Sequence, residues 1–416
     1  MEISDWSTIN IDMTQTSAHQ PNIETLLSRG VEQVLPDTTS LTKLMTQRPI
    51  RLYLGIDPTG SELTLGHAVV LRKLQQFALA GHQVILLIGN GTVKIGDPTG
   101  RDSTRPMLTE EVIDQNWQNW RKQASKVLDF DLIQVKKNGD WLDQLTYVDI
   151  VKLLGQTTVQ QLLERDMFQA RMKNGLPIFG HEIIYPLLQG YDSVVMDVDL
   201  EIGGNDQLFN MMMGRQLLQT MKQKDKWVLT TPIINGTDGR KMSKSYNNYI
   251  ALTENPIDMY GKLMRVADSE IVTYFTVLTD LELAEVESIK QAMASGQNPM
   301  QFKHQLAHTI TTWLHDNHSA DQARDHFKSA VQDKSVPTDA PMIEFDQSEL
   351  KVADVLRACL PQESTNNLRR LLDQGAIELF PSGAKPGQMS DLIDLKTESG
   401  IRIGKLSFFR LERRSI

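Results

Sequence analysis

Residues 51–90 read RLYLGIDPTGSELTLGHAVVLRKLQQFALAGHQVILLIGN and contain two apolar segments separated by an amphipathic one. The first segment, LYLGI, predicts a strand that the turn residues DPTG end. From Gly66 to Gly81 the apolar residues are spaced for one buried face of a helix. The continuous run QVILLIGN then predicts a parallel strand that is buried on both faces. Strand, helix and strand make a βαβ unit, which predicts an α/β fold with a doubly wound parallel sheet.

The rest of the chain separates into segments that differ in their pattern of apolar and polar residues. DSVVMDVDLEIGG, residues 192–204, predicts another strand, and NDQLFNMMMGRQLLQTM, residues 205–221, predicts the helix after it. Residues 109–190 are expected to be mostly helical and to form an insertion between the two halves of the sheet. The expected segments are an extension at 1–48 with one helix around 22–34, an α/β domain at 49–246 with a helical insertion at about 120–180, a helical domain at 247–332, a linker at 333–342, and a small α+β domain at 343–416.

The composition is that of an ordinary globular protein in a reducing compartment. Hydrophobic residues make up 40% and charged residues 23% of the 416 positions. No window approaches the ~18 uncharged apolar residues of a membrane span, and the polar start MEISDWSTINIDMTQ is unlike a signal peptide. Cys359 is the single cysteine, which excludes an intramolecular disulfide and a cysteine-rich zinc site. We therefore expect a cytoplasmic protein without a tightly bound metal.

The charge is distributed unevenly along the chain. A formal net charge of -9 argues against general nucleic-acid binding, although not against a local basic patch. The stretch from about residue 343 carries nearly balanced charge, with Arg369 and Arg370 adjacent and a final Arg- and Lys-rich segment, GIRIGKLSFFRLERRSI. Two short helices and then strands are expected there. A small RNA-facing module on an acidic body fits this pattern, and a solvated helical cap is the alternative.

Residues 239–249, GRKMSKSYNNY, place Lys241 and Lys244 three positions apart in a segment with no apolar face. Gly236 and Gly239 make a loop the expected structure. One interpretation is a solvated turn with two ordinary surface lysines. The other is a mobile loop that carries two cations to a polyphosphate.

The first strand–helix junction, GIDPTGSELTLGH, offers a second candidate anion site. A helix N-terminus presents free N–H groups and a positive dipole end. Gly66 allows a ligand to approach the backbone, His67 supplies a donor, and Thr59 and Thr64 add hydroxyl groups. A structural role is the alternative, but ligands bind at the carboxyl ends of strands in such sheets. Neither a Walker motif nor a GxGxxG fingerprint follows this strand.

LTLGH and KMSKS, taken together, resemble the two signature motifs of class I aminoacyl-tRNA synthetases in order and separation. The segments YLGIDPTGSELTLGH, IGDPTGRDSTR, YPLLQGYD and IGGNDQ further match bacterial tyrosyl-tRNA synthetases, from about residue 30 to the end. The C-terminal stretch resembles their S4-like RNA-binding domain. The resemblance implies a Rossmann-like catalytic domain, a helical anticodon-side domain, and a homodimer formed through the insertion. It also implies a ligase that forms tyrosyl-adenylate from L-tyrosine and ATP, with Mg²⁺, and then tyrosylates the terminal adenosine of tRNA(Tyr).

The resemblance also implies roles for the matched positions. Tyr53 and Asp192 would bind the substrate hydroxyl, and Asp97, Tyr185 and Gln189 would surround its ammonium. The ammonium, as a cation, needs acceptors. Residues 185, 189 and 192 have the spacing for one face of a helix. The other matched residues are Gly55, Asp57, Gly66, Gly204, Asp206 and Gln207 for the nucleotide and adenylate, with Gln207 also in the tyrosine pocket; Thr59, Thr64, His67, Arg101, Arg105, Lys241, Lys244 and Ser245 for the phosphates; and Arg369, Arg370, Lys405 and Arg410 for RNA.

Two positions depart from the tyrosyl pattern. Thr64 stands where most tyrosyl enzymes have a histidine, although its hydroxyl can still donate to phosphate and tryptophanyl enzymes resemble it there. Asn205 replaces the usual Ser or Thr before Asp206. Two further interpretations therefore stand beside the tyrosyl enzyme. Tryptophan specificity is disfavoured by Tyr53 and Asp192, because an indole has no hydroxyl. A non-catalytic RNA-binding paralogue is disfavoured by the complete lysine loop and tyrosine pocket.

Overall fold

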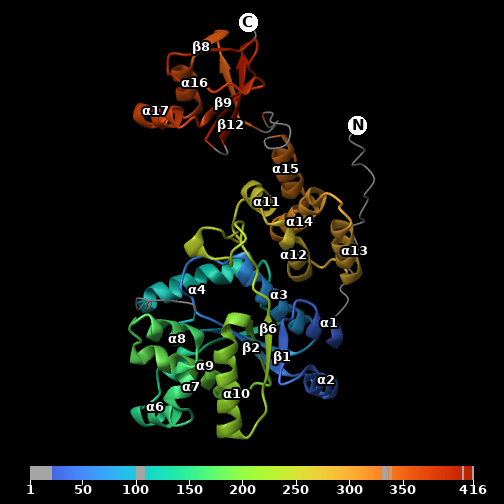
Figure 1. The fold of residues 1–416 in the computed structure, drawn as a ribbon, viewed down its shortest axis with the longest axis vertical. Helices are drawn as coiled ribbons and strands as arrows, with labels where there is room; N and C mark the ends of the chain where they lie inside the picture. The colour runs from blue at the N-terminus through green and yellow to red at the C-terminus, as the bar shows by residue number, and fades with distance from the viewer. Residues whose placement is uncertain (1–20, 100–107, 330–335, 337–339, 405–406, 415–416) are drawn as a thin grey trace. The chain divides into compact units, whose positions relative to one another are not determined.

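The computed structural model describes residues 21–99, 108–329, 336, 340–404 and 407–414. The chain divides into two compact units. Figure 1 draws the chain coloured by residue number from the N-terminus to the C-terminus. The first contains the residues up to 253 together with 272–291, and the second contains 254–271 and the residues from 292 onward. The expected α/β class is confirmed, and the expected boundaries at residues 48, 246, 332 and 342 stay predictions.

The first unit is built on a six-stranded sheet with the strand order β1-β6-β5-β2-β3-β4. The five strands from β6 to β4 in this order pair in parallel with one another, and β1 is antiparallel to β6 at the edge. The chain winds from β2 to β3 and β4 on one side, and returns to β5 on the other. Such sheets bind ligands at the carboxyl ends of the strands, at the point where the strand order reverses, which here lies between β2 and β5. The strands are β1 (Gln33–Leu35), β2 (Arg51–Ile56), β3 (Gln83–Ile88), β4 (Ile133–Lys137), β5 (Leu200–Gly204) and β6 (Trp227–Thr231).

Helix α3 (Leu65–Leu79) connects β2 to β3, as the apolar spacing predicts. Thr64, in extended conformation, is its N-cap residue. Leu71, Leu74 and Phe77 are buried, and the helix packs against β2, β3 and β5. The predicted βαβ unit is therefore confirmed, and it brings the start of α3 to the carboxyl end of β2.

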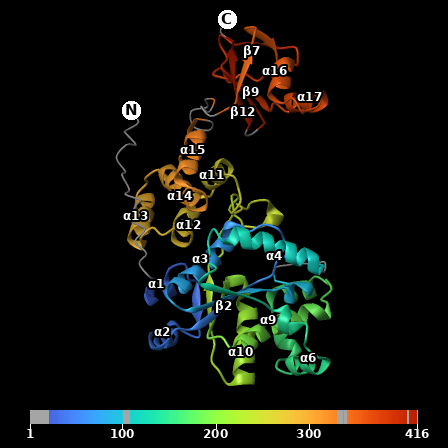
Figure 2. The ribbon, with the colours of Figure 1, turned by 180° about the vertical axis from the view of Figure 1, so that it is seen from behind.

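Helices α9 (Gly180–Met196) and α10 (Leu208–Lys222) pack side by side, as both ribbon views show (Figures 1 and 2). The prediction of a strand across residues 192–204 is wrong for its first half. The helix continues to Met196 and ends at Asp197, whose φ of 51° is left-handed, and the strand begins at Leu200. Helix and strand are both buried here, and a continuous apolar run does not distinguish the two.

The segment between β3 and α9 is mostly helical, as expected, but it also contains β4. This strand extends the sheet beyond β3. Its sequence, IQVKK, mixes polar and apolar residues because one edge of the strand is solvated, so the sequence pattern does not predict a strand. The segment contains α4 (Glu110–Ala124), α5 (Gly139–Leu142), α6 (Tyr147–Leu154), α7 (Val159–Leu163) and α8 (Asp166–Lys173).

The expected single helix around 22–34 is wrong. Two helices, α1 (Ile23–Ser28) and α2 (Thr38–Gln47), flank the edge strand β1. Gly30, with a φ of 61°, turns the chain after α1. Arg29 then donates to main-chain oxygens of residues 275, 276, 279 and 281, and Lys73 donates to the oxygens of Leu26 and Arg29. These contacts attach the N-terminal helices to the first unit through side chains that sequence periodicity does not reveal.

The second unit is helical and then α+β, as expected. Helices α11 (Pro256–Met264), α14 (Pro299–Leu314) and α15 (Asn317–Phe327) pack together, and α12 (Ile271–Leu278) and α13 (Leu283–Ala294) lie at the division between the units in the sequence. The expected final strand at 400–416 is two antiparallel strands, because Gly404, with a φ of 73°, turns the chain. The C-terminal elements are β7 (Met342–Phe345), β8 (Glu349–Lys351), α16 (Val352–Cys359), α17 (Thr365–Asp373), β9 (Ile377–Phe380), β10 (Leu392–Asp394), β11 (Gly400–Ile403) and β12 (Ser407–Arg413).

Candidate active site

Asp57, directly after β2, connects three elements at the carboxyl end of the sheet. Its Oδ1 accepts a hydrogen bond from the hydroxyl of Thr92 at 2.7 Å, and its Oδ2 accepts one from the hydroxyl of Tyr185 at 2.9 Å. A Cβ on Gly89 would lie 1.9 Å from Oδ1 of Asp57, so only glycine fits after β3. The carboxylate is thus held between the loop after β3 and helix α9, where a ligand of a doubly wound sheet would bind.

Tyr185, Gln189 and Asp192 lie on α9, as their spacing predicts. Asp192 is 2% exposed, and it accepts hydrogen bonds from Nδ2 of Asn138 at 3.1 Å and from the indole N–H of Trp141 at 2.8 Å. Burial raises the pKa of the Asp192 carboxyl well above its ordinary value, while the two donors act in the opposite direction. A buried carboxyl group with neutral donors is a strong acceptor for one more hydroxyl.

Tyr53, in β2, lies fully buried beside this carboxyl group. Its hydroxyl is 3.0 Å from Oγ of Ser193. Burial raises the pKa of the Tyr53 phenol well above its ordinary value, and the negative charges of Glu201 and Asp192 raise it further. The predicted pair, Tyr53 and Asp192, is thus electrostatically coupled, while each side chain has its own fixed partners.

Asp97 and Gln207 face each other across the same edge of the sheet. The carboxamide of Gln207 donates to Oδ2 of Asp97 at 2.8 Å, and Asn210 donates to Oε1 of Gln207 at 2.9 Å. The other carboxylate oxygen of Asp97 accepts from the backbone and hydroxyl of Thr99. The guanidinium of Arg165 donates to the Thr99 hydroxyl at 2.7 Å. Asp97 and Gln207 therefore lie in contact, and their role in binding tyrosine stays a prediction.

Thr64 and His67 form the first turn of α3. Nδ1 of His67 accepts from the backbone N–H of Thr64 at 3.1 Å and lies 2.9 Å from the Thr64 hydroxyl. Burial and the nearby charge of Lys244 lower the pKa of the imidazole to about 4. His67 is therefore neutral at physiological pH, and Nε2 carries its proton because Nδ1 accepts the amide bond. A neutral N–H donor at a helix N-terminus can bind a phosphate oxygen.

Helix α4 holds the loop that precedes α3. The carboxamide of Gln123 accepts from the Leu63 amide at 2.7 Å and donates to the Ser61 carbonyl at 2.7 Å. Asn116 donates to the carbonyl of Pro58 at 2.9 Å. Thr59 lies exposed in this loop, so its hydroxyl faces solvent from a backbone that α4 constrains.

The lysine loop is an ordered hairpin in the structure. Asn235 and Lys241 form an antiparallel bridge, and the side chain of Asn248, 2% exposed, donates to Asp238 and to the carbonyls of Arg240 and Lys241. Oδ1 of Asn248 accepts from the Ser243 amide at 2.8 Å. These hydrogen bonds hold the backbone of the loop while both lysine side chains are exposed, and the two interpretations of the loop stay predictions.

The two signature segments, far apart in the sequence, lie against each other. The Leu65 amide donates to the Ile250 carbonyl, and the Leu252 amide donates to the Leu63 carbonyl, both at 2.9 Å. Lys244 donates to the Glu62 carbonyl at 2.5 Å. Lys241 forms an ion pair with Asp206 at 2.9 Å. The structure thus places Lys244 beside the loop between β2 and α3, and Lys241 beside the residues after β5.

The remaining predicted residues fall into three groups. Gly55 is the last residue but one of β2, Gly66 lies in the first turn of α3, and Gly204 ends β5. A Cβ on Gly204 would lie 2.7 Å from Oδ1 of Asp206. Arg369 and Arg370 are exposed on α17, whereas Arg410 is half-buried and donates to the Ala340 carbonyl at 3.2 Å. Exposed Ser245 lies in the lysine loop, and Arg101, Arg105 and Lys405 lie outside the described residues.

Sequence inspection missed the residues that support the pocket. Asn138 and Trp141 follow β4, which the sequence pattern does not predict. Ser193 and Glu201 lie in the segment predicted as a strand, without a role, and no predicted element contains Lys226. Asn248 belongs to a run of Asn that had been attributed to a solvated turn. The available signal was chemical: a polar or charged residue within an otherwise apolar segment needs a partner when it is buried.

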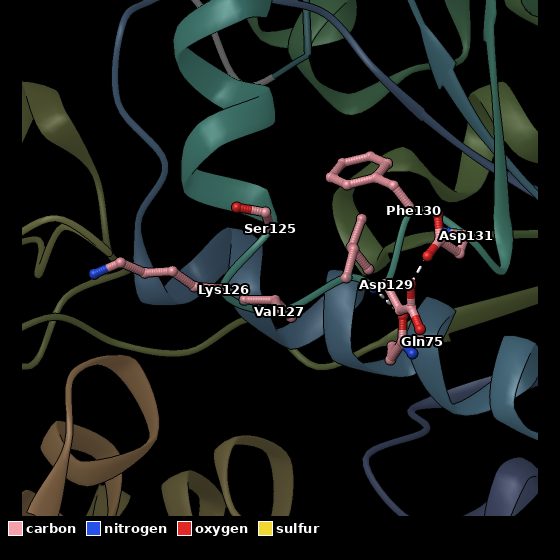
Figure 3. A pocket seen from close by; sticks show the side chains of 8 residues that line it. Gln75, Ser125, Lys126, Val127, Asp129, Phe130 and Asp131 are labelled. Carbon is pink, nitrogen blue, oxygen red and sulfur yellow. Dashed lines mark hydrogen bonds between the residues drawn. The ribbon is translucent and has the colours of Figure 1, made fainter.

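A hollow at the end of α4 is distinct from this site. Gln75 and residues 125–131 line it, and Figure 3 shows Phe130 and the side chains of Asp129 and Gln75 around it. The Asp129 amide donates to Oε1 of Gln75 at 2.9 Å, which fastens the turn after α4 to α3. None of the predicted site residues lines this hollow.

Among the described residues, no group of three or more His, Cys, Asp or Glu side chains has a metal-binding arrangement. None of the described helices is long and apolar enough to span a membrane.

Comparison with known proteins identifies the family. The family described as tRNA synthetases class I (W and Y) matches residues 45–332. The chain is 40% identical over 388 residues to tyrosine–tRNA ligase of Thermotoga maritima, covering 93% of this chain and 96% of that protein. It is also 40% identical over 398 residues to tyrosine–tRNA ligase 2 of Photorhabdus laumondii, covering 94% and 99%.

Solved structures agree in fold. Tyrosyl-tRNA synthetase of Archaeoglobus fulgidus, complexed with L-tyrosine, aligns with a TM-score of 0.59 at 23% identity over 73% of this chain and 100% of that chain. Tryptophanyl-tRNA synthetase of Plasmodium falciparum aligns with a TM-score of 0.53 at 16% identity, over 69% and 80%. At these identities the likeness supports the fold alone.

Proposed function

The chain belongs to the family of class I tRNA synthetases for tryptophan and tyrosine, and we propose that it is a tyrosine–tRNA ligase. The resemblance to tyrosyl enzymes is confirmed by relatives at 40% identity over more than nine tenths of the chain. The reaction has two steps. The carboxylate of L-tyrosine attacks the α-phosphorus of ATP and releases pyrophosphate, and the terminal ribose of tRNA(Tyr) then attacks the acyl carbon of tyrosyl-adenylate.

The buried carboxyl group of Asp192, beside the hydroxyl of Tyr53, is the observation that carries the choice of tyrosine. A phenol that enters this place can donate to Asp192 and accept from Tyr53. Phenylalanine would leave the same buried polar groups without a partner, which costs more than the lost hydrogen bond alone. An indole has no hydroxyl to occupy the position. These properties disfavour tryptophan, whose synthetases share the family and the fold.

The amino group of the substrate would be bound by acceptors on the other side of the pocket. Tyr185, Gln189, Asp97 and Gln207 are the proposed residues. Tyr185 donates its hydroxyl hydrogen to Asp57, so its oxygen is available to accept from an ammonium. Asp97 supplies the negative charge, and its hydrogen bond from Gln207 keeps the carboxylate oriented.

ATP would bind where the loop after β2, the start of α3 and the lysine loop meet. Gly55, Asp57, Gly66, Gly204 and Asp206 are proposed to line the adenylate, because glycine permits close approach to the backbone. Catalysis requires no nucleophilic side chain; it would come from positioning and from charges that stabilise the departing pyrophosphate. Mg²⁺ bound by the phosphate oxygens would supply further positive charge. The proposed phosphate ligands are Thr59, Thr64, His67, Arg101, Arg105, Lys241, Lys244 and Ser245.

Exchange of labelled pyrophosphate into ATP, without tRNA, tests the first step and the amino-acid specificity. The protein is assayed in parallel with tyrosine, phenylalanine and tryptophan. Exchange with tyrosine alone is expected. Exchange with tryptophan would reassign the substrate, and no exchange with any of the three would favour a non-catalytic RNA-binding paralogue.

The C-terminal residues 343–416 are proposed to be an S4-like RNA-binding domain that contacts tRNA, with the helical domain at 247–332 on the anticodon side. Arg369 and Arg370 are exposed together on α17, which supports a phosphate-binding surface. Arg410 and Lys405 are proposed members of the same surface. Filter binding of tRNA(Tyr) to the Arg369→Ala/Arg370→Ala variant tests the assignment: weaker binding with unchanged pyrophosphate exchange is expected, and unchanged binding would contradict it.

A homodimer formed through the insertion is also proposed. Tyr147 and Val148 on α6 are 82% and 55% exposed, and Val159 on α7 is 60% exposed. A cluster of exposed apolar side chains of this kind marks an association surface. Light scattering is expected to give the mass of two chains, and Val148→Asp is expected to shift it toward one. A monomeric wild-type protein would contradict the proposal.

A further inference from the structure

A buried ion pair lies behind the hydroxyl end of the tyrosine pocket, and none of the steps proposed above uses it. Lys226, immediately before β6, is 0% exposed, and its partner Glu201 in β5 is 1% exposed. Burying two opposite charges is costly unless further hydrogen bonds satisfy the donors and acceptors that the two groups do not use with each other. The surroundings of this pair meet that condition.

The ammonium of Lys226 uses all three of its hydrogens. It donates to Oε2 of Glu201, to Oγ of Ser193 at 2.8 Å, and to the carbonyl of Met211 at 3.1 Å. The second carboxylate oxygen of Glu201 accepts from the carboxamide of Gln189 at 3.1 Å. An ammonium has three N–H donors and no acceptor, so its hydrogen-bonding capacity is filled.

Small residues on α9 and α10 make room for the pair. A Cβ on Gly214 would lie 2.4 Å from Nζ of Lys226 and 2.8 Å from Oγ of Ser193. A Cβ on Gly190 would lie 3.0 Å from the Gly214 nitrogen. The close approach of the two helices and the position of the ammonium therefore require glycine at both sites.

The ion pair contacts two residues of the proposed tyrosine pocket. Ser193 Oγ lies 2.8 Å from Lys226 and 3.0 Å from the Tyr53 hydroxyl, so one serine connects them. Glu201 connects the pair to Gln189 in the same way. Strand register places Tyr53 and Glu201 opposite each other on β2 and β5, which keeps the group compact.

We propose that Lys226 is a positioning residue that orients the Tyr53 hydroxyl toward the substrate phenol and so contributes to the preference for tyrosine over phenylalanine. The inference rests on the proposed function. An ammonium that donates to Ser193 polarises the serine hydroxyl and makes it a better donor. Ser193 then donates to Tyr53, Tyr53 donates to the phenol oxygen of the substrate, and the phenol donates to Asp192. Every hydrogen in this chain points from the buried cation to the buried carboxyl group.

Ser193→Ala is the mildest test, because it removes the connecting hydroxyl and leaves the ion pair in place. The readout is pyrophosphate exchange with tyrosine and with phenylalanine at varied ATP. We expect the KM for tyrosine to rise about tenfold and the tyrosine-to-phenylalanine ratio of kcat/KM to fall by a similar factor, since one hydrogen bond in the chain is lost. The KM for ATP should stay within about twofold.

A double-mutant cycle shows whether Ser193 acts through Tyr53. In a Tyr53→Phe background the hydroxyl that Ser193 orients is absent, so Ser193→Ala should have no further effect on the KM for tyrosine. If the two substitutions instead change the KM for tyrosine by independent factors that multiply, Ser193 does not act through Tyr53, and the proposed chain of hydrogen bonds is overturned.

Lys226→Met/Glu201→Gln tests the ion pair itself without leaving a buried charge unpaired. We expect the same loss of discrimination as in Ser193→Ala. The matched control is Arg171→Met/Glu182→Gln, which neutralises another fully buried pair, with side chains 1% and 2% exposed. This control should keep the tyrosine-to-phenylalanine ratio within about twofold even if it lowers stability.

The two proposals fail in different ways. A wild-type protein without tyrosine-dependent exchange would overturn the proposed function itself. An active wild-type protein whose Ser193→Ala and Lys226→Met/Glu201→Gln variants keep its KM for tyrosine and its ratio would overturn the role of Lys226 alone. An equal loss of ratio in the Arg171→Met/Glu182→Gln control would also overturn it, because any buried ion pair would then have the same effect.

Discussion

The hydroxyl of Thr64 lies 2.9 Å from Nδ1 of His67, within the first turn of α3. In the tyrosyl pattern that the sequence resembles, a histidine usually stands at position 64. Here the threonine instead contacts His67, the last residue of the same motif, and its backbone N–H donates to the same nitrogen. The departure in sequence therefore has a structural consequence: the threonine contacts Nδ1 of the imidazole, which leaves Nε2 as the nitrogen that can donate to a phosphate.

Replacing Thr64 by valine removes this contact while keeping the shape of the side chain. We expect kcat for pyrophosphate exchange to fall about tenfold, because the imidazole loses one of the groups that orient it, with the KM for tyrosine unchanged. Stability should fall by about 1 kcal/mol, the typical value of one hydrogen bond. Steady-state exchange kinetics and urea unfolding check the two effects. An unchanged kcat would show that the hydroxyl does not orient His67 during catalysis.

The pKa of His67 predicts a specific dependence of stability on pH. Burial and Lys244 lower it from 6.5 to about 4 in the folded protein. Between these values the unfolded chain binds a proton that the folded chain does not, so stability decreases as pH falls from about 6.5 toward 4. His67→Asn lacks this titration and should lose less stability over the same range. Urea midpoints at pH 7.5 and 4.5 for both proteins check the difference, and parallel losses would contradict the assignment.

Asp192→Asn should separate activity from stability. Loss of the carboxylate weakens the hydrogen bond to the phenol, and bonds to charged groups contribute about 1.5–3 kcal/mol, so kcat/KM for tyrosine should fall about 10–100-fold. Burial raises the pKa of Asp192, so ionisation in the folded state becomes more costly as pH rises above the ordinary value. The variant should therefore be at least as stable as the wild type at pH 8. Exchange kinetics and unfolding midpoints provide the check; a large loss of stability would point to a structural role.

Lys241→Met and Lys244→Met should lower kcat with little change in the KM for tyrosine. The lysines lie beside Asp206 and the Glu62 carbonyl, where a departing pyrophosphate would gain charge in the transition state. A decrease of about 10–100-fold is expected for each, since a charge-assisted contact is lost. Arg240→Met removes another cation of the same loop and is the matched control. Equal losses in all three variants would mean that only the overall charge of the loop matters.

Asn248→Ala should loosen the lysine loop without unfolding the protein. The side chain makes hydrogen bonds to Asp238, Arg240, Lys241 and Ser243 from a buried position, so its removal leaves backbone groups without partners. We expect faster tryptic cleavage within the loop and a lower kcat, with the KM for tyrosine preserved. If the loop of the variant resists trypsin as well as the wild-type loop does, the role of Asn248 is contradicted.

The local sequence was sufficient for the elements in which periodicity and turn residues agree. The unit from β2 to β3, helix α10 and the two C-terminal helices follow the predicted pattern, because each has either a clear apolar face or a continuous buried run between turn residues. The edge strands β1 and β4 were missed, because short strands with one solvated edge lack such a run. Residues 192–196 were misassigned, because a helix buried on several sides is as uniformly apolar as a parallel strand.

For this protein, the sequence alone determined the reaction class and the order of the two signature segments. Those features depend on residue types at short spacing, which the chain shows directly. Only the tertiary structure decided which groups contact the proposed pocket residues. Asn138 and Trp141 reach Asp192 from another segment, and Lys226 reaches Tyr53 through Ser193. A buried polar group must find its partner in space, and that partner comes from whichever element folding brings alongside.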